Sequence, residues 1–212
     1  MSDYYSIPRK ADWNYGGARW KLSRSKIALF QECPRCFYLD NKLGLKRPPG
    51  YPFNLNTAVD TLLKTEFDLH RVNGEQHPLQ KQYGLKARPV AHELLDVWRA
   101  NFEGVQYLHE PTGLLVSGAI DDLWIDEDGK YIVVDYKATA KSEPVTELND
   151  DWHEGYKRQM EVYQWLLRHQ GLPVSDTGYF VYCTGRPDAK AFDARIEFDV
   201  HLIAYTGSDA WV

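Results

Sequence analysis

The sequence predicts an α/β (α+β) protein in which helices flank a mixed central sheet. The apolar runs Leu114–Ile125 and Lys130–Asp135 are typical of strands, and the tetrad Asp126–Gly129 between them favours a hairpin, because glycine accepts the positive φ of a tight turn. Amphipathic helices are predicted over residues 55–73 and 151–169, before and after this hairpin. Because two more strands follow the second helix, that helix is expected to be a crossover in a mixed sheet.

Length and composition predict one domain over residues 1–212, with an irregular basic segment over residues 1–50. The 212 residues, 43% of them hydrophobic and 26% charged, suffice for a substantial core. No apolar run reaches the roughly 18 residues of a membrane span, and no leader is visible, so a cytoplasmic protein without a membrane partner is expected. Three cysteines do not make a disulfide framework, which favours reduced thiols.

Charge is unevenly distributed along the chain. The net charge is −5, but residues 1–50 hold ten Lys or Arg against four Asp or Glu, so they carry +6 and the remainder carries −11. A basic segment on an acidic body suits phosphate contact beside a carboxylate-rich metal site, and a solvated charge run explains it equally well. Phosphate contact is predicted for Arg35, Lys42, Lys46 and Arg47.

The first 50 residues are expected to hold an irregular stretch over 1–22 and then two short helices. Ser25 is the expected N-cap of the first helix, and Pro34 suits the first turn of the second. Cys33 and Cys36 have the spacing of half a metal site, because two thiolates so placed can reach one ion. The missing second pair favours the alternative, two small buried residues at a helix junction.

The helix over 55–73 places a carboxylate among its apolar residues. These recur at helical spacing, at Leu55, Ala58, Val59, Leu62, Leu63 and Phe67. At about 100° per residue, Glu66 falls between Leu62 and Val59, so it is predicted to face the core. It is interpreted either as a snorkelling or hydrogen-bonded residue or as a third acidic group aimed at a metal site.

The remaining elements are expected to be structural. They are a polar loop at 74–90, a helix at 91–102, a strand at 104–109, a turn at 110–113, a loop at 140–151 and final strands at 177–184 and 192–203.

Two carboxylates and an amine fall on the predicted hairpin. An antiparallel pairing places Asp121 across the ladder from Asp135. Side-chain alternation points Asp135 and Lys137 to one face and Tyr136 to the other. Carboxylates in apolar strands need a cation, a hydrogen-bond network or a metal. The set is therefore either a structural salt bridge with Asp121 close by or a metal-binding catalytic site.

Gln159 and Tyr163 lie four residues apart on the helix over 151–169, hence on one face. Both side chains can hydrogen-bond phosphate or water, and Lys157 and Arg158 are close in the sequence. The alternative is a core Tyr163 and a surface Gln159.

The motifs occur in a recognisable order: Gly-x-x-Asp, a hairpin, Asp-x-Lys and a helix with Gln-x-x-x-Tyr. They comprise Gly118, Asp121, Asp135, Lys137, Gln159 and Tyr163. This order resembles the PD-(D/E)XK nuclease superfamily, specifically its RecB-like branch, which includes the CRISPR-adaptation nucleases. The resemblance spans roughly residues 23 to 205. Asp-x-Lys alone is a weak signal, whereas the combination of motifs is specific.

The resemblance implies a restriction-endonuclease-like core and metal-dependent hydrolysis of phosphodiester bonds in DNA, including single-stranded ends. Mg²⁺ or Mn²⁺ would be held by Asp121, Asp135 and the backbone carbonyl of Tyr136, with Glu66 as a further catalytic and metal-binding carboxylate. Lys137 would orient the attacking water or stabilise charge on the phosphate. The substrate strand would be positioned by Gln159, Tyr163, Lys157 and Arg158.

The sequence departs from this family in three places. The family often has a His on the first helix, where this chain has Asp60, and Glu66 is ranked above Asp60 as the third acid. Relatives with an iron–sulfur cluster use one cysteine near Cys33 and three near the C-terminus, and the absence of that trio argues against a cluster. The relatives also continue into a helix beyond residues 206–212, so this segment is interpreted either as part of a shortened form or as a frayed end.

An alternative function is that of a catalytically silent nuclease-fold protein that binds nucleic acid or serves as an assembly module. The filled acidic and basic positions argue against decay of the site. A small-molecule hydrolase lacks support, because the sequence contains no Gly-x-Ser-x-Gly, P-loop or His-Glu-x-x-His motif.

Overall fold

The computed structural model describes residues 11–48, 50 and 54–212. Their contacts divide into two compact units, an N-terminal unit (Met1–Pro52 with Gln106–Ser117) and a larger unit (Phe53–Val105 with Gly118–Val212). No helix in the described ranges combines the length and the apolar character that crossing a membrane would require.

The N-terminal unit combines short helices with a small sheet. Its elements are η1 (Ala11–Trp13), β1 (Leu22–Ser23), α1 (Arg24–Glu32), α2 (Pro34–Leu43), β3 (Val105–His109) and β4 (Leu114–Gly118). The strand order is β1-β4-β3, with β1 parallel to β4. The N-cap of α1 is Ser23 rather than the expected Ser25. α2 begins at Pro34, as predicted, and its C-cap is Gly44 in the left-handed conformation, with a φ of 73°.

The larger unit is built on a five-stranded mixed sheet. Its elements are α3 (Asn54–Asn73), α4 (Pro78–Gln82), β2 (Ala87–Pro89), α5 (Leu95–Arg99), β5 (Asp122–Asp126), β6 (Tyr131–Ala140), η2 (Asp151–His153), α6 (Glu154–Arg168), β7 (Thr177–Gly185) and β8 (Phe198–Thr206). The strand order is β2-β5-β6-β7-β8, in which β6 and β7 are parallel and the other pairs are antiparallel. α6 connects the two parallel strands, which confirms the predicted crossover.

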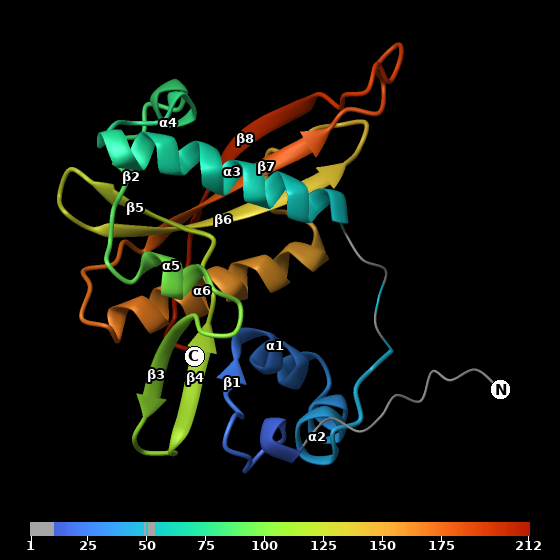
Figure 1. Cartoon of the computed structure of the whole chain (residues 1–212), viewed down its shortest axis with the longest axis vertical. Helices are drawn as coiled ribbons and strands as arrows, with labels where there is room; N and C mark the ends of the chain where they lie inside the picture. The colour runs from blue at the N-terminus through green and yellow to red at the C-terminus, as the bar shows by residue number, and fades with distance from the viewer. Residues whose placement is uncertain (1–10, 49, 51–53) are drawn as a thin grey trace. The chain divides into compact units, whose positions relative to one another are not determined.

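The sheet of the larger unit lies between α3 on one face and α6 on the other (Figure 1). Alternate residues of β6 point to these two helices. The ring of Tyr136 packs near Phe67 of α3, with centroids 5.7 Å apart, whereas Asp135 accepts a hydrogen bond from Gln159 of α6. β6 therefore packs its aromatic ring against α3 and presents its carboxylate to α6.

Two parts of the predicted sheet differ from the structure. Leu114–Ile125 is not one strand, because β4 ends at Gly118, β5 begins at Asp122, and the two strands belong to different sheets. The place beside β5 is taken by β2, which comes from the expected loop at 74–90. A continuous apolar run conceals this break, because hydrophobicity alone does not show which sheet a strand joins.

Two other element boundaries were wrong. The expected helix over 91–102 is the five-residue α5, and β8 begins at Phe198 rather than at residue 192. The hairpin turn, α3, α6 and the start of β7 fall where the sequence predicts them.

The last residues pack on α6. The indole N–H of Trp211 and the hydroxyl of Tyr205 donate hydrogen bonds of 2.5 and 2.6 Å to Glu161. Arg168 pairs with Asp209 at 2.5 Å. Of the two interpretations of this segment, the frayed end is contradicted, because side chains of α6 hold the segment in place.

Candidate active site at the β5–β6 hairpin

The turn of the hairpin brings the two predicted acids together. Asp126 accepts hydrogen bonds from the backbone N–H groups of residues 128 and 130, and Gly129 has a φ of 78°. In the resulting register Asp122 pairs with Val134. Asp121, one residue before β5, therefore lies beside Asp135 at the end of the ladder.

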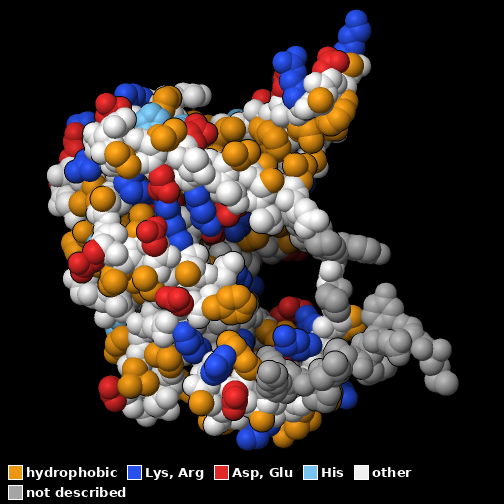
Figure 2. Space-filling model, viewed as in Figure 1, with side chains coloured by type: hydrophobic (Ala, Val, Ile, Leu, Met, Phe, Trp, Pro, Cys, Tyr) orange, Lys and Arg blue, Asp and Glu red, His pale blue; other side chains and the backbone are white. Residues whose placement is uncertain are grey.

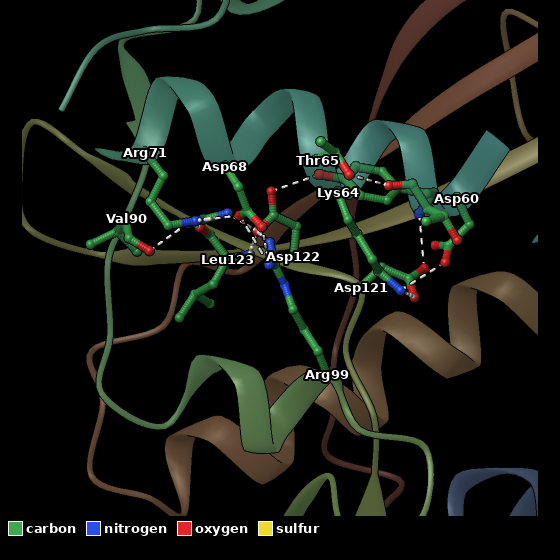
Figure 3. A network of polar contacts seen from close by, with 12 residues as sticks. Asp60, Lys64, Thr65, Asp68, Arg71, Val90, Arg99, Asp121, Asp122 and Leu123 are labelled. Atoms are coloured by element: carbon green, nitrogen blue, oxygen red, sulfur yellow. Dashed lines mark hydrogen bonds and ion pairs between the residues drawn. The ribbon is translucent and has the colours of Figure 1, made fainter. Parts of the chain in front are cut away.

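Asp121 is held by a backbone amide and an amine. Its Oδ2 accepts a hydrogen bond of 3.0 Å from the backbone N–H of Tyr136. Its Oδ1 lies 3.4 Å from the Nζ of Lys64 on α3, which also pairs with Asp60 at 2.9 Å (Figure 3). Burial alone would lower the pKa of Lys64, but the charges of Asp121 and Asp60 outweigh it and raise that pKa.

Asp135 is fully buried and lies between an amide and an amine. The side-chain N–H of Gln159 donates a hydrogen bond of 2.7 Å to Oδ1, and Lys137 forms an ion pair with Oδ2. Gln159 also donates to the hydroxyl of Tyr163 at 3.0 Å, as expected for residues four apart on a helix. The structure thus brings the predicted acid, lysine and glutamine into one cluster, with Tyr163 behind them.

Lys137 contacts an aromatic ring as well as an acid. Its Nζ lies 4.4 Å from the centroid of Tyr156 on α6, which is cation–π distance. Burial would lower the pKa of Lys137, but the neighbouring Asp135 and Asp121 charges outweigh burial and raise the pKa.

The motif glycine makes room for the motif tyrosine. A Cβ on Gly118 would lie 2.7 Å from Cε1 of Tyr163, closer than carbon atoms pack. The ring of Tyr163, which is buried, therefore needs glycine at this position. This contact gives a physical reason why the Gly-x-x-Asp and Gln-x-x-x-Tyr motifs occur together.

The expectation that Glu66 faces the core was wrong. Its side chain is 55% exposed, and its carboxylate lies 2.7 Å from Nε2 of His77. The buried side of α3 is narrower than predicted, since Leu63 and Phe67 are buried while Leu62 is 67% exposed. Asp60, ranked second from the sequence, is the acid that α3 brings towards Asp121, through the shared Lys64.

Lys157 and Arg158 lie on α6 beside Gln159. Lys157 forms an ion pair of 2.6 Å with Glu154, and Arg158 is half-buried. Their predicted contact with a substrate strand stays a prediction.

Cys33 and Cys36 adjoin the first turn of α2. Their Sγ atoms are 2.6 Å apart, and Cys33 accepts a hydrogen bond from the Cys36 backbone N–H. Hydrogen bonding to the side chain and then the backbone of Cys36 lowers the pKa of Cys33, with a further contribution from Arg47. Both thiols are half-exposed, so the expectation of two buried residues was wrong.

Asp122 is a neighbour of the site that sequence reasoning missed. It is fully buried, and the side chains that donate to its carboxylate are those of Arg71, Arg99, Trp124 and Tyr136. Arg71 and Arg99 also pair with Asp68 of α3 (Figure 3). Side-chain alternation, which sends Asp122 to the opposite face from Asp121, was the signal available in the sequence.

Lys64 was also missed, although its spacing of four residues from Asp60 is the signal of a helical ion pair. On the face of the larger unit seen in Figure 2, acidic and basic side chains interleave below α3. Around Asp121, the amine of Lys64 compensates the charges of both Asp121 and Asp60.

Oxygen atoms are the donors that this cluster offers to a metal ion. Within residues 11–48, 50 and 54–212, no three His, Cys, Asp or Glu side chains form a ready metal site. Asp121 and Asp135 instead face the amines of Lys64 and Lys137, whose charges compensate the carboxylates. Carboxylates are the ligands that hard divalent cations prefer, so the donor chemistry fits Mg²⁺ or Mn²⁺.

Comparison with known proteins identifies a family for this chain. No curated protein matches the sequence. The model of a family described as the PD-(D/E)XK nuclease superfamily matches residues 21–201, a span that contains the hairpin acids, Lys137 and the glutamine–tyrosine pair of α6. Because the match covers most of the chain, and because its acidic and basic side chains converge on the hairpin, this protein belongs to the PD-(D/E)XK nuclease superfamily.

Proposed function

We propose that this protein is a nuclease of the RecB-like branch that hydrolyses phosphodiester bonds in DNA, including single-stranded ends. The observation that carries the proposal is the arrangement of Asp121, Asp135 and Lys137 at the end of the β5–β6 ladder. Membership of a nuclease superfamily supports it. An acid pair beside an amine is suited to charged phosphate chemistry, because the acids can hold a cation and the amine can stabilise negative charge on the phosphate.

The ligands proposed for Mg²⁺ or Mn²⁺ are the carboxylates of Asp121 and Asp135 and the backbone carbonyl of Tyr136. Asp60 is proposed as the third acid in place of Glu66, because Asp60 shares an amine with Asp121 while Glu66 pairs with His77. When bound, such an ion supplies Lewis acidity towards the scissile phosphate.

The side chains of the cluster have separate roles in this proposal. Gln159 fixes Oδ1 of Asp135 by its hydrogen bond and so orients the carboxylate. Lys137, held by the Tyr156 ring and by Asp135, places a positive charge where negative charge develops on the phosphate. Tyr163 supports Gln159 through its hydroxyl. Lys157 and Arg158, which adjoin Gln159 on α6, would contact the substrate strand.

The test is a cleavage assay on end-labelled single- and double-stranded DNA with Mg²⁺, Mn²⁺ or EDTA. We expect product with either metal and none with EDTA. The Asp135→Asn variant, which keeps the shape of the side chain, is the control for a contaminating nuclease. DNA binding without cleavage under every condition would favour the catalytically silent alternative and contradict the proposal.

A further inference from the structure

Lys64 is a second amine at the site, and it comes from a different element than Lys137. Its Nζ lies 2.9 Å from Asp60, one turn earlier on α3, and 3.4 Å from Oδ1 of Asp121 (Figure 3). Its side chain is 25% exposed, so it is not enclosed by the packing of α3 on the sheet. A helix-surface ion pair with Asp60 would not by itself require the second contact with Asp121.

The two oxygens of Asp121 are held differently. Oδ2 accepts the backbone N–H of Tyr136, which is fixed in β6, whereas Oδ1 faces only the flexible side chain of Lys64 among the contacts described. Lysine carries its charge on a four-carbon stem with free rotation. Oδ1 is therefore the oxygen at which one cation can replace another.

An amine and a divalent ion repel each other when they bind the same carboxylate oxygen. A cation that binds Oδ1 of Asp121 therefore weakens the ion pair between this oxygen and Lys64 and favours release of the amine. The aliphatic stem of Lys64, fixed on α3 one turn from Asp60, would keep the displaced amine near the site. The released ammonium would then lie close to the cation, where the proposed function requires the negatively charged phosphodiester.

We propose that Lys64 is a second catalytic lysine that alternates between the acids and the substrate. In the metal-free protein its ammonium neutralises Asp60 and Asp121. When a divalent cation binds, the ammonium is released from Asp121 and contacts a non-bridging phosphate oxygen of DNA. This inference rests on the proposed nuclease function.

Two opposite effects of one substitution test the proposal. Lys64→Met keeps an unbranched side chain as long as the aliphatic stem of lysine, together with the helix propensity, but removes the competing charge. Calorimetric titration with Mn²⁺ should show binding about fivefold tighter, the scale of a partly exposed ion pair. Single-turnover cleavage at saturating Mn²⁺ should fall on the order of a hundredfold, because a charge contact to the phosphate is lost.

Two further variants separate this role from a structural one. Lys64→Arg keeps a cation on the helix and should restore part of the cleavage rate. Lys86→Met removes a lysine from an exposed pair with Glu127 and should change neither measurement. Circular dichroism establishes that each variant is folded.

The outcomes distinguish this inference from the proposed function. If Lys64→Met leaves either the Mn²⁺ affinity or the cleavage rate unchanged, or weakens Mn²⁺ binding, the inference is overturned and Lys64 is a surface ion pair. If the unaltered protein binds no Mn²⁺, both the proposed function and the inference fail.

Discussion

The hydroxyl of Tyr136 donates a hydrogen bond of 2.7 Å to the buried carboxylate of Asp122. The backbone N–H of the same tyrosine donates to Asp121. One residue thus links the acid of the candidate site to the acid buried beside it. Burial and then the Asp122 charge raise the pKa of Tyr136, so its hydroxyl stays protonated and remains a donor.

Tyr136→Phe removes this donor and leaves the ring in place. We expect the free energy of unfolding to fall by about 2 kcal/mol, since the lost hydrogen bond has a charged acceptor. Urea denaturation measures the change. Tyr83→Phe, at a residue that is 42% exposed, is the control. Equal losses in the two variants would contradict the prediction.

Variants of Asp121 and Asp135 should differ from variants of Lys137 in their affinity for Mn²⁺. Asp121→Ala and Asp135→Ala remove oxygen donors, so we expect Mn²⁺ affinity and cleavage to be lost together. Lys137→Met keeps the aliphatic stem near Tyr156 and should retain Mn²⁺ binding while cleavage slows on the order of a hundredfold. Calorimetry and cleavage assays on each variant test this. Normal Mn²⁺ binding in both Asp variants would refute the ligand assignment.

Gln159→Glu should make stability depend on pH. The new carboxyl group would lie beside the buried Asp135, and repulsion between like charges raises the folded-state pKa above its unfolded value. The variant therefore keeps its full free energy of unfolding below the unfolded-state pKa of the new group. It loses stability as the pH rises from there through the folded-state pKa. The unfolding midpoint of the variant should match the wild type near about pH 4 and fall below it towards neutrality. Gln159→Leu, which adds no charge, should show no such trend.

Gly118→Ala should strain the packing behind the site. Because the added Cβ would lie 2.7 Å from the Tyr163 ring, we expect a loss of about 1–3 kcal/mol in the free energy of unfolding. Combining it with Tyr163→Ala should recover part of this loss, which a double-mutant cycle measures. If the two losses simply add, the Tyr163 ring is not what excludes a side chain at residue 118.

The cysteines should differ in reactivity. Hydrogen bonds with Cys36 lower the pKa of Cys33, so more of its thiolate is present at a given pH, whereas burial raises the pKa of Cys183 to about 11. Iodoacetamide at neutral pH should therefore modify Cys33 well before Cys183, as peptide mass spectrometry can show. Cys36→Ser, which replaces one hydrogen-bonding side chain by a weaker acid, tests whether Cys36 controls this rate. Equal rates at Cys33 and Cys183 would disprove the assignment.

Local chemistry explains which parts of the fold could be predicted. The Asp126–Gly129 turn and the 3.6-residue period of α6 are encoded by neighbouring residues, so the hairpin and crossover were predicted correctly. The break between β4 and β5 could not be predicted, because it depends on which partner each strand finds. The three-residue strand β2 is too short to show the two-residue alternation of apolar and polar side chains by which a strand is predicted.

In the candidate site, too, the features set by neighbouring residues could be predicted, and those set by packing between distant segments could not. Alternation along a strand predicts that Asp135 and Lys137 share a face, and helical spacing predicts that Gln159 lies beside Tyr163, but the contact of Gln159 with Asp135 was not predicted. The contact between Lys64 and Asp121 joins residues 57 positions apart, so it appears only when α3 packs on the sheet. Glu66 was misplaced because the sequence shows an apolar arc but not how much of that arc the sheet covers.

The parallel pairing of β6 with β7 has a consequence for the order of folding. Residues 141–176 separate the two strands, so their pairing must close a long loop, whereas the β5–β6 hairpin closes a short one. Pairings between distant segments form slowly, and the hairpin can form first. Asp135 would then meet Gln159 only after α6 docks. A partly folded chain with its hairpin formed would hold both acids before Gln159 could orient Asp135.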